Sequence, residues 1–351
     1  MKRAIAISAI LLLLFGCALP GQEPSVAPQP QPQPVPVPSP EPEINVSIGN
    51  GSVAEGANAT ANGTLPSEGG TEAEILPETP RNVSGSIMDG QFAIRENFAT
   101  PLKVYVIKDG QADSVLVNKG EFNMLVDAGS FAQVDAFLKK MGITRLNVVV
   151  ATRDYSGAIG GIPNLLDSYK VDELWDNGAA QEGTAYYSLL EKAREKKVLL
   201  KGPEALESME VNGMTVTVLN PQLQRIFSNP DNDAIVLKLS AGNFCMLLLN
   251  PTVQERENVL ISTGENLRCD VITYYKHGEG RPEPSLLISS YAKPKDAIIS
   301  VGVNNSVGLP TNTTLTRLAL QSIKVWRTDT GGTVLVEAKS DGSSYTVSGN
   351  N

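Results

Sequence analysis

The chain has 351 residues, of which 41% are hydrophobic, and its formal net charge is −9. This length is sufficient for one large domain with a substantial core, in addition to extensions outside it. The charge is spread along the chain without a Lys/Arg block, so we do not expect a nucleic acid partner, because such binding relies on clustered cations.

The N-terminus is typical of a secreted lipoprotein. Lys2 and Arg3 precede an apolar run, residues 4–15, that is shorter than the roughly 20 residues of a membrane span. The sequence Leu-Phe-Gly-Cys that ends at Cys17 resembles a lipobox, in which the cysteine is lipidated and begins the mature chain. The alternatives to a lipoprotein signal are an ordinary cleaved signal peptide and an uncleaved membrane anchor. We therefore expect a signal peptide at 1–16 and a lipid at Cys17 that holds the chain at the outer face of the cytoplasmic membrane, on an archaeal surface or in a bacterial envelope.

A linker and a stalk are predicted next. In residues 17–43, every second residue from Pro28 to Pro42 is proline, which fixes φ and removes backbone donors. This linker is expected to run as extended polyproline II, at about 3.1 Å per residue. Residues 44–90 are rich in Gly, Ser, Thr, Asn and Glu, and they are predicted to form a disordered stalk because they have little to bury.

Asn-x-Ser/Thr sequons are concentrated in the stalk. Linkers rich in Asn, Ser and Thr also produce sequons by chance, but their density here favours a glycosylated surface segment. The sequons begin at Asn45, Asn50, Asn58, Asn62, Asn82, Asn304 and Asn312.

The remaining segment, residues 91–351, alternates strand-length apolar runs with helical patterns, which predicts an α/β layered domain. The tail at 325–349 has turn signals at Thr330-Gly331-Gly332 and at Asp341-Gly342, and it is predicted to be a closing β-meander. Helices are expected at 131–141, 162–168, 184–197, 252–260, 284–291 and 312–322.

Residues 148–166 resemble the metal-binding turn of the metallo-β-lactamase superfamily, in which a strand ends in T-H-x-H-x-D-H and continues into G-G and a helix. The resemblance implies an αββα four-layer sandwich. It is closest to the lactamase-like domain of the ComEC-type competence proteins, whose first strand is similar to residues 104–117. Other similar segments are 122–130, 171–179, 216–221, 231–239 and 300–310, so that the resemblance covers about residues 100 to 338.

The metal ligands implied by this resemblance are substituted. Zinc needs imidazole, thiolate or carboxylate donors at about 2.0–2.3 Å. Thr152, Ile159, Gly160 and Gly161 keep the pattern of the turn, but its four ligand positions carry Arg153, Tyr155, Gly157 and Ala158. Later in the chain, Pro251 replaces the bridging aspartate, Lys276 replaces one histidine of a pair that keeps His277, and Leu309 replaces a third-loop histidine.

We therefore expect no zinc cofactor, and a non-catalytic domain that serves as a binding or scaffolding module. The alternative is an extracellular hydrolase, a phosphodiesterase or nuclease as the resemblance implies. Metal-free catalysis by Ser156 and His277 is a further, weaker alternative, because no spacing argument brings them together.

The substituted loops would converge on a candidate pocket, with Asp113 and Asp127 nearby. Two interpretations remain open. Arg153 and Lys276 replace the positive charge of the metal and bind an anion such as a phosphate or a sugar acid. Otherwise, as we favour, they pair with Asp127, Asp154 or Glu279 and stabilise a pocket without ligand. The partner would be an envelope protein, a glycan or a small anion. The candidate pocket residues are Arg153, Tyr155, Lys276, His277, Glu279 and Asp127.

Cys245 and Cys269 each lie near the start of a predicted strand. An oxidising location permits a disulfide. Alternating side-chain directions would equally place the two residues on opposite faces of a sheet, where each would act as a small apolar residue. Both alternatives remain open from the sequence.

Overall fold

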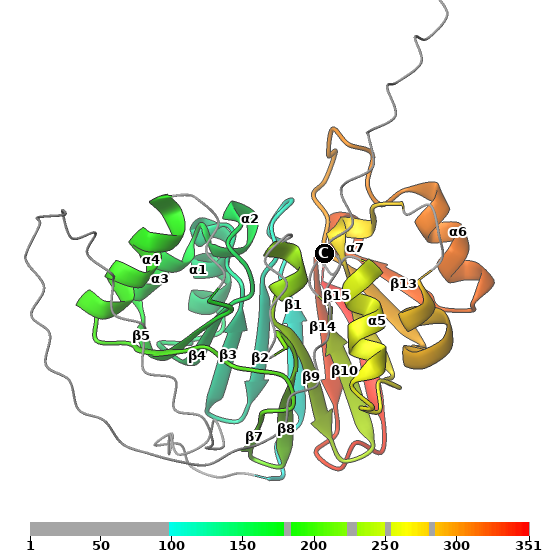
Figure 1. Cartoon of the computed structure of the whole chain (residues 1–351), viewed down its shortest axis with the longest axis horizontal. Coiled ribbons are helices and arrows are strands. Elements are labelled where there is room, and N and C mark those ends of the chain that lie inside the picture. Colours follow the sequence, from blue (N-terminus) through cyan, green and yellow to red (C-terminus); the bar gives the residue numbers. More distant parts are fainter. Residues whose placement is uncertain (1–97, 179–183, 223–229, 250–253, 281–284, 351) are drawn as a thin grey trace, which may run out of the picture. The chain divides into compact units, whose positions relative to one another are not determined.

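The computed structural model describes residues 98–350 except 179–183, 223–229, 250–253 and 281–284. Two β-sheets pack face to face, and helices cover the outer face of each (Figure 1). The predicted αββα sandwich is therefore confirmed. The predictions for the signal peptide, Cys17, the linker and the stalk with its sequons lie outside the described residues.

Sheet A has eight strands in the order β15-β14-β1-β2-β3-β4-β5-β6. Pairing is antiparallel from β15 to β3 and parallel from β3 to β6. The β4 run Asn-Val-Val-Val-Ala is buried throughout because both faces of this part of the sheet are covered. The bounds are β1 Leu102–Val106, β2 Val115–Lys119, β3 Phe122–Val126, β4 Arg145–Ala151, β5 Lys170–Asp176, β6 Leu199–Lys201, β14 Thr333–Ala338 and β15 Tyr345–Asn350.

Sheet B has seven strands in the order β13-β12-β11-β10-β9-β8-β7. Its pairing also changes direction, from parallel between β13 and β10 to antiparallel between β10 and β7. The bounds are β7 Ser208–Val211, β8 Met214–Asn220, β9 Val236–Ala241, β10 Phe244–Leu248, β11 Val271–Tyr274, β12 Asp296–Ile299 and β13 Lys324–Arg327.

The helices follow the sequence prediction within a few residues. Helices α1 to α4 pack on sheet A, whereas α5, the π-helix η3 and α6 pack on sheet B. Helix α6 begins where the Thr311 side chain accepts a hydrogen bond from the Thr314 amide, as expected for an N-cap threonine. No helix of the described part is long and apolar enough to cross a membrane. The bounds are α1 Phe131–Lys140, α2 Ser156–Ile159, α3 Ile162–Ser168, α4 Thr184–Glu195, α5 Gln254–Ser262, η3 Leu287–Ala292, α6 Asn312–Leu320 and the short α7 Thr328–Gly331.

The central core lies between the sheets and takes one face from each. Val104 and Met124 of sheet A are fully buried in it, as are Leu237 and Met246 of sheet B. A residue such as Leu125, next to Met124, points instead to the outer core beneath the helices. This alternation follows from the two-residue period of a strand.

Residues 104–117, predicted to form one strand, form two. Strand β1 ends at Val106 and β2 begins at Val115, and the loop between them turns at Gly110, whose φ is +66°. This loop, residues 107–114, carries polar groups that a strand in the covered sheet would leave without partners. It instead forms part of the candidate site.

The predicted meander at 325–349 is wrong in its first strand. Strand β13 pairs with β12 in sheet B, whereas β14 and β15 form a hairpin in sheet A. The chain changes sheets through α7 and Gly332, whose φ is +67°, and the Thr328 hydroxyl holds this crossing by bonding to Val301. The predicted turn at Asp341-Gly342 does join β14 to β15.

Cys245 and Cys269 form a disulfide, so the structure selects the first of the two alternatives. Their Cα atoms are 4.9 Å apart. Cys245 lies in β10 and packs with the outer core of sheet B, on the face where the chain passes before it enters β11 at Val271. The disulfide thus joins β10 to the segment that precedes the neighbouring strand β11.

Candidate functional site

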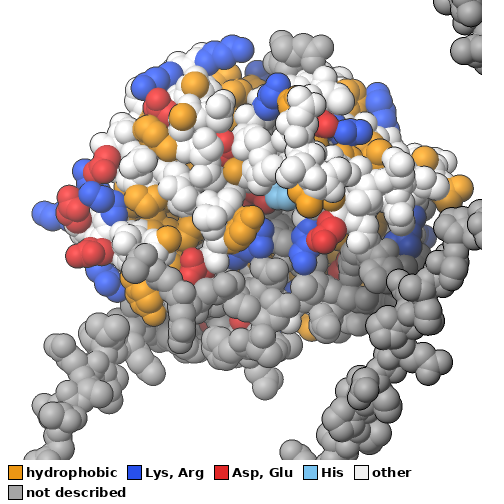
Figure 2. Space-filling view, turned by 90° about the horizontal axis from the view of Figure 1, so that it is seen from above, with side chains coloured by type: hydrophobic (Ala, Val, Ile, Leu, Met, Phe, Trp, Pro, Cys, Tyr) orange, Lys and Arg blue, Asp and Glu red, His pale blue; other side chains and the backbone are white. Residues whose placement is uncertain are grey.

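The substituted loops of both sheets meet where β3, β4, β11 and β12 end. Asp127 follows β3, Arg153 follows β4 and His277 follows β11. The carboxyl ends of parallel strands are the usual position of sites in open α/β sheets. In the view of Figure 2, the one histidine of the chain is visible at the surface of this end.

Asp127 is 1% exposed and has a φ of +60°. Its two oxygens accept hydrogen bonds from Thr152, one from the amide at 2.8 Å and one from the hydroxyl at 2.7 Å. Burial raises the pKa of this carboxyl to about 8, against the lowering effects of Thr152 and of the positive charge on Arg153. Burial thus favours the neutral form of the Asp127 carboxyl, which is a poorer metal ligand than the carboxylate.

Arg153 stacks on Tyr155, with the guanidinium carbon 4.3 Å from the centre of the ring. The ring in turn covers Gly157, because a Cβ at that position would lie 2.5 Å from Tyr155 Cε1. Three of the four substituted positions of the turn thus pack on one another. Such a cation–π contact is favourable without a metal.

The Gly160-Gly161 pair has a packing role in this turn. A Cβ on Gly161 would lie 2.5 Å from the Phe131 amide nitrogen and 2.8 Å from the Ala128 carbonyl oxygen, and the Gly161 amide donates to that same oxygen at 2.7 Å. Since only glycine allows this approach, the pair is required by the fold whether or not a metal is bound.

His277 donates from Nδ1 to the Ser300 carbonyl oxygen at 2.9 Å, because a carbonyl can only accept. The same nitrogen lies 3.8 Å from Asp113 Oδ1. Lys276 and His277 both have left-handed backbones, with φ of 48° and 52°, and they form a tight turn closed by a bond from the Gly278 amide to the Tyr275 oxygen. The turn directs the imidazole towards β12.

A cavity of about 10 Å³ lies among these loops, between Asp113, Lys276 and Ser300 on one side and the apolar Val126 and Leu249 on the other. This volume holds about one water molecule. Lys276 and Asp113, from loops of the two sheets, therefore come together around a space of this size.

The structure brings together most of the predicted pocket residues. Lys276 lines the cavity, His277 contacts Asp113, and Arg153 and Asp113 both influence the pKa of Asp127. Tyr155 stacks on Arg153 and is 44% exposed, at the rim.

Glu279 is not part of this cluster. Its side chain is exposed. Its backbone makes two hydrogen bonds: the Glu279 amide donates to the Lys276 oxygen, and the Glu279 carbonyl oxygen accepts from the Thr314 hydroxyl. Ser156 is also exposed and makes no hydrogen bond with His277, so the Ser–His arrangement has no support in the described residues.

Two of the predicted glycosylation residues are described. Asn304 and Asn312 are both exposed, the second at the start of α6. The hydroxyl residue of the second sequon, Thr314, is 2% exposed and bonds to Glu279. The use of either sequon stays a prediction.

The sequence reasoning missed the role of the loop 107–114, which connects the sheets at the site. Buried Asp109 accepts hydrogen bonds from Ser114 Oγ and the Ser130 amide, and burial raises its pKa. The Asp113 amide donates to Gly157 in sheet A, and the Ala112 oxygen accepts from Ser300 Oγ in sheet B. The signal was the polar run Asp-Gly-Gln-Ala-Asp-Ser between two apolar segments.

A buried charge pair beside the site was also missed. Arg256 of α5 and Asp233 are 1% and 0% exposed, with 3.4 Å between Nη2 and Oδ1. Burial lowers the pKa of Arg256. The neighbouring Ile235 amide donates to the Thr152 oxygen, so the pair lies close to the substituted turn. An arginine in a polar helical segment gives no sequence signal of burial.

The donors of the site do not fit a zinc centre. Within the described ranges, no group of three or more His, Cys, Asp or Glu residues is placed to hold a metal ion. Both Asp127 oxygens are bonded to Thr152. His277 Nδ1 is bonded to a carbonyl, so this residue could offer a metal only its other ring nitrogen, Nε2. Arg153 and Lys276 bring positive charge where relatives would bind cations.

The two packed sheets, with helices on both outer faces, agree with the metallo-β-lactamase fold that the sequence resembles. No protein-family model matches the chain. In sequence it is similar to ComE operon protein 3 of Bacillus subtilis (strain 168), with 27% identity over 211 residues. The match covers 60% of this chain but only 27% of that protein, so the chain spans about a quarter of its relative's length. The similarity agrees with the competence-type resemblance.

Solved structures similar to the chain include the metallo-β-lactamase fold protein YhfI from Bacillus subtilis, at 14% identity, a TM-score of 0.47 and coverage of 68% of this chain and 100% of that one. Igni18, a metallo hydrolase from Ignicoccus hospitalis, is similar at 11% identity, a TM-score of 0.44 and coverage of 66% and 98%.

Proposed function

We propose that this protein is a surface-anchored lipoprotein whose metallo-β-lactamase-like domain is a metal-free binding or scaffolding module. The lipid on Cys17 would hold it to the membrane, and the linker and stalk would carry the domain away from the surface. Its partner would be an envelope protein, a glycan or a small anion.

One observation carries this proposal. The loops that hold metal in the resembling superfamily here carry Arg153 stacked on Tyr155, a hydrogen-bonded Asp127 and a cavity with room for about one water molecule. Metal-assisted hydrolysis needs a bound and acidified water together with open space for a substrate. The exposed residues around these loops could contact a partner, whereas the small cavity leaves little room for a substrate. These features support binding better than they support hydrolysis.

The rim residue Tyr155 provides a direct test of binding. A photo-crosslinking amino acid at position 155, in the full chain expressed in the source cells, is expected to capture a partner from the envelope. Tyr187 of α4, which is 56% exposed and lies on a helix of sheet A, is the matched control position. Equal capture at both positions, or none at 155, would contradict a binding role for this end of the domain.

An extracellular phosphodiesterase or nuclease is the alternative, and the retained Asp113, Asp127 and His277 favour it over other enzymes. The discriminating assay is hydrolysis of bis(p-nitrophenyl) phosphate by the full chain with zinc or manganese. We expect no turnover above that of the buffer. Metal-dependent turnover that Asp127→Ala and His277→Ala abolish would establish the alternative.

A further inference from the structure

A second, larger depression lies at the other end of sheet B. Its volume is about 370 Å³, and residues at the beginning of β10 and in the segments that enter β11 and β12 line it. The substituted site lies where β11 and β12 end, so the strands separate the two by about 13 Å, at about 3.3 Å per residue over the four residues of β11. The depression is therefore independent of that site.

Positive charge is concentrated in this depression, although the chain as a whole has a net charge of −9. One acidic residue, Asp270, is also present. The lining cations are Lys238, Arg268, Lys293 and Lys295. They come from β9 and from the two segments that precede β11 and β12, so residues distant in sequence converge here.

Two of these cations are already engaged. Lys295 Nζ lies 2.9 Å from Asp270 Oδ1, and Lys238 Nζ donates to the Asn266 carbonyl oxygen at 2.6 Å. Arg268 and Lys293 are exposed, and their side chains make no hydrogen bond or ion pair with any described residue. Two charged donors in the depression are therefore available to a ligand.

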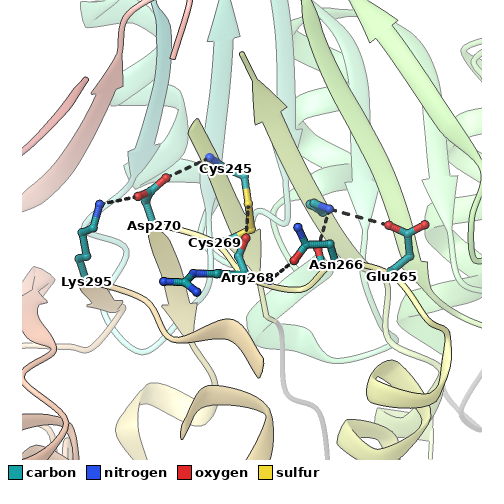
Figure 3. The surroundings of a disulfide bond; sticks show 8 residues. Cys245, Glu265, Asn266, Arg268, Cys269, Asp270 and Lys295 are labelled. Atoms are coloured by element: carbon teal, nitrogen blue, oxygen red, sulfur yellow. Dashed lines mark hydrogen bonds and ion pairs between the residues drawn. A yellow bond between two sulfur atoms is a disulfide. The ribbon is translucent and has the colours of Figure 1, made fainter. Parts of the chain in front are cut away.

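The backbone around the depression is cross-linked at Cys269, the residue that follows Arg268. Cys269 forms the disulfide with Cys245, and the Asp270 carboxylate accepts hydrogen bonds from the Cys245 amide and from Lys295 Nζ (Figure 3). The Asp270 carbonyl oxygen also accepts from the Lys295 amide. A site whose backbone is held in this way loses less entropy when a ligand binds.

We propose that this depression is a binding site for a small, soluble phosphorylated molecule of about sugar-phosphate size. The guanidinium of Arg268 matches two phosphate oxygens, and Lys293 supplies a second positive charge. The volume is within the range of small-ligand pockets, about 300–1,000 Å³. Ser240, Asn243 and Asn266 in the lining offer partners for hydroxyl groups.

Isothermal titration of the full chain tests this site with two probes, glucose 6-phosphate and glucose. The proposal predicts saturable binding of the phosphate ester with a dissociation constant below about 1 mM, and at least tenfold weaker binding of glucose. Arg268→Ala with Lys293→Ala is expected to weaken binding of the ester by tenfold or more, with an unchanged melting temperature because both side chains are exposed.

The matched control removes the same charges elsewhere, with Lys140→Ala and Arg194→Ala on the exposed faces of α1 and α4. This variant should bind the ester as the native chain does. An equal loss in both variants would show general electrostatic attraction and overturn the proposal, as would an absence of saturable binding. Binding to anionic phospholipid vesicles but not to the soluble ester would assign the depression to a membrane surface and contradict a soluble ligand.

Discussion

At the scale of single residues, Asp127, His277 and Asp109 of the candidate site each make hydrogen bonds to other residues of the protein. Asp127 is held by Thr152, His277 by Ser300 and Asp109 by Ser114 and Ser130. A buried polar group without a partner costs about 1–3 kcal/mol, so these bonds stabilise the loops in the absence of a ligand. The polar side chains of the site therefore stabilise the conformation of the loops that carry them.

The raised pKa of Asp127 predicts a pH dependence of stability. Between pH 3.8 and about 8 the unfolded chain has lost this proton and the native chain retains it, so the free energy of unfolding decreases as pH rises through that window. Asp127→Asn removes this titrating group from both the native and the unfolded state. Relative to this variant, the native chain is expected to lose stability between pH 4 and pH 8, by on the order of 5 kcal/mol. Chemical denaturation of both proteins across this range measures the difference.

The opposite result would be equally informative. If Asp127 is ionised and paired with Arg153, the variant would be less stable than the native chain by a similar amount at pH 6 and pH 8. That outcome would support the charge-pairing interpretation of the pocket in place of a neutral carboxyl.

At the scale of elements, α5 is attached beside the site by a buried ion pair. Removal of one partner of such a pair leaves an uncompensated charge and typically costs 3–5 kcal/mol. Arg256→Ala and Asp233→Ala are each expected to lower the free energy of unfolding by about this amount. The double variant should cost less than the sum of the two. Urea denaturation of the three variants completes the cycle, and strictly additive losses below about 1 kcal/mol each would show that the pair is not coupled.

The disulfide is the second link between elements. It closes a loop with a sequence separation of 24 residues between β10 and the start of β11, which corresponds to about 3.5 kcal/mol in the chain-entropy account. Addition of a reductant is expected to lower the free energy of unfolding by roughly this amount. The variant Cys245→Ser with Cys269→Ser should show the same stability with and without reductant. A native chain that reductant leaves unchanged would mean that the disulfide does not form in solution.

The elements were largely predictable from the sequence, for identifiable reasons. The apolar runs of β3 to β5 and the amphipathic pattern of α1 have the periods of a covered sheet and a packed helix. The exchange of sheets at Thr328 depends on a contact with Val301, which is distant in sequence. Periodicity therefore located β13, but it did not reveal the sheet in which this strand lies.

The site was less predictable than the fold. The substituted positions, such as Arg153 and Lys276, were found because a known pattern marks them. Asp109 and Asp233 lie in segments of the resemblance that give them no role, and Arg256 lies outside all of them; the burial of these residues results from tertiary packing. The exposure of Glu279 is likewise set by the tight turn at Lys276-His277, whose left-handed backbone the local sequence does not predict.

At the scale of the whole molecule, the two sheets bring together the loops that carry Arg153, Lys276 and His277. The central core between the sheets is well packed, since large residues such as Trp175, Phe122 and Phe244 are buried in it.

The metal content of the full chain, purified from medium supplemented with zinc and manganese, tests this account most directly. Mass spectrometry of the digested protein is expected to find less than about 0.1 equivalents of either metal, because the donor set offers no group of three ligands within the described residues. One or two equivalents of zinc per chain, removed by a chelator with a fall in melting temperature, would contradict the account and restore the hydrolase interpretation.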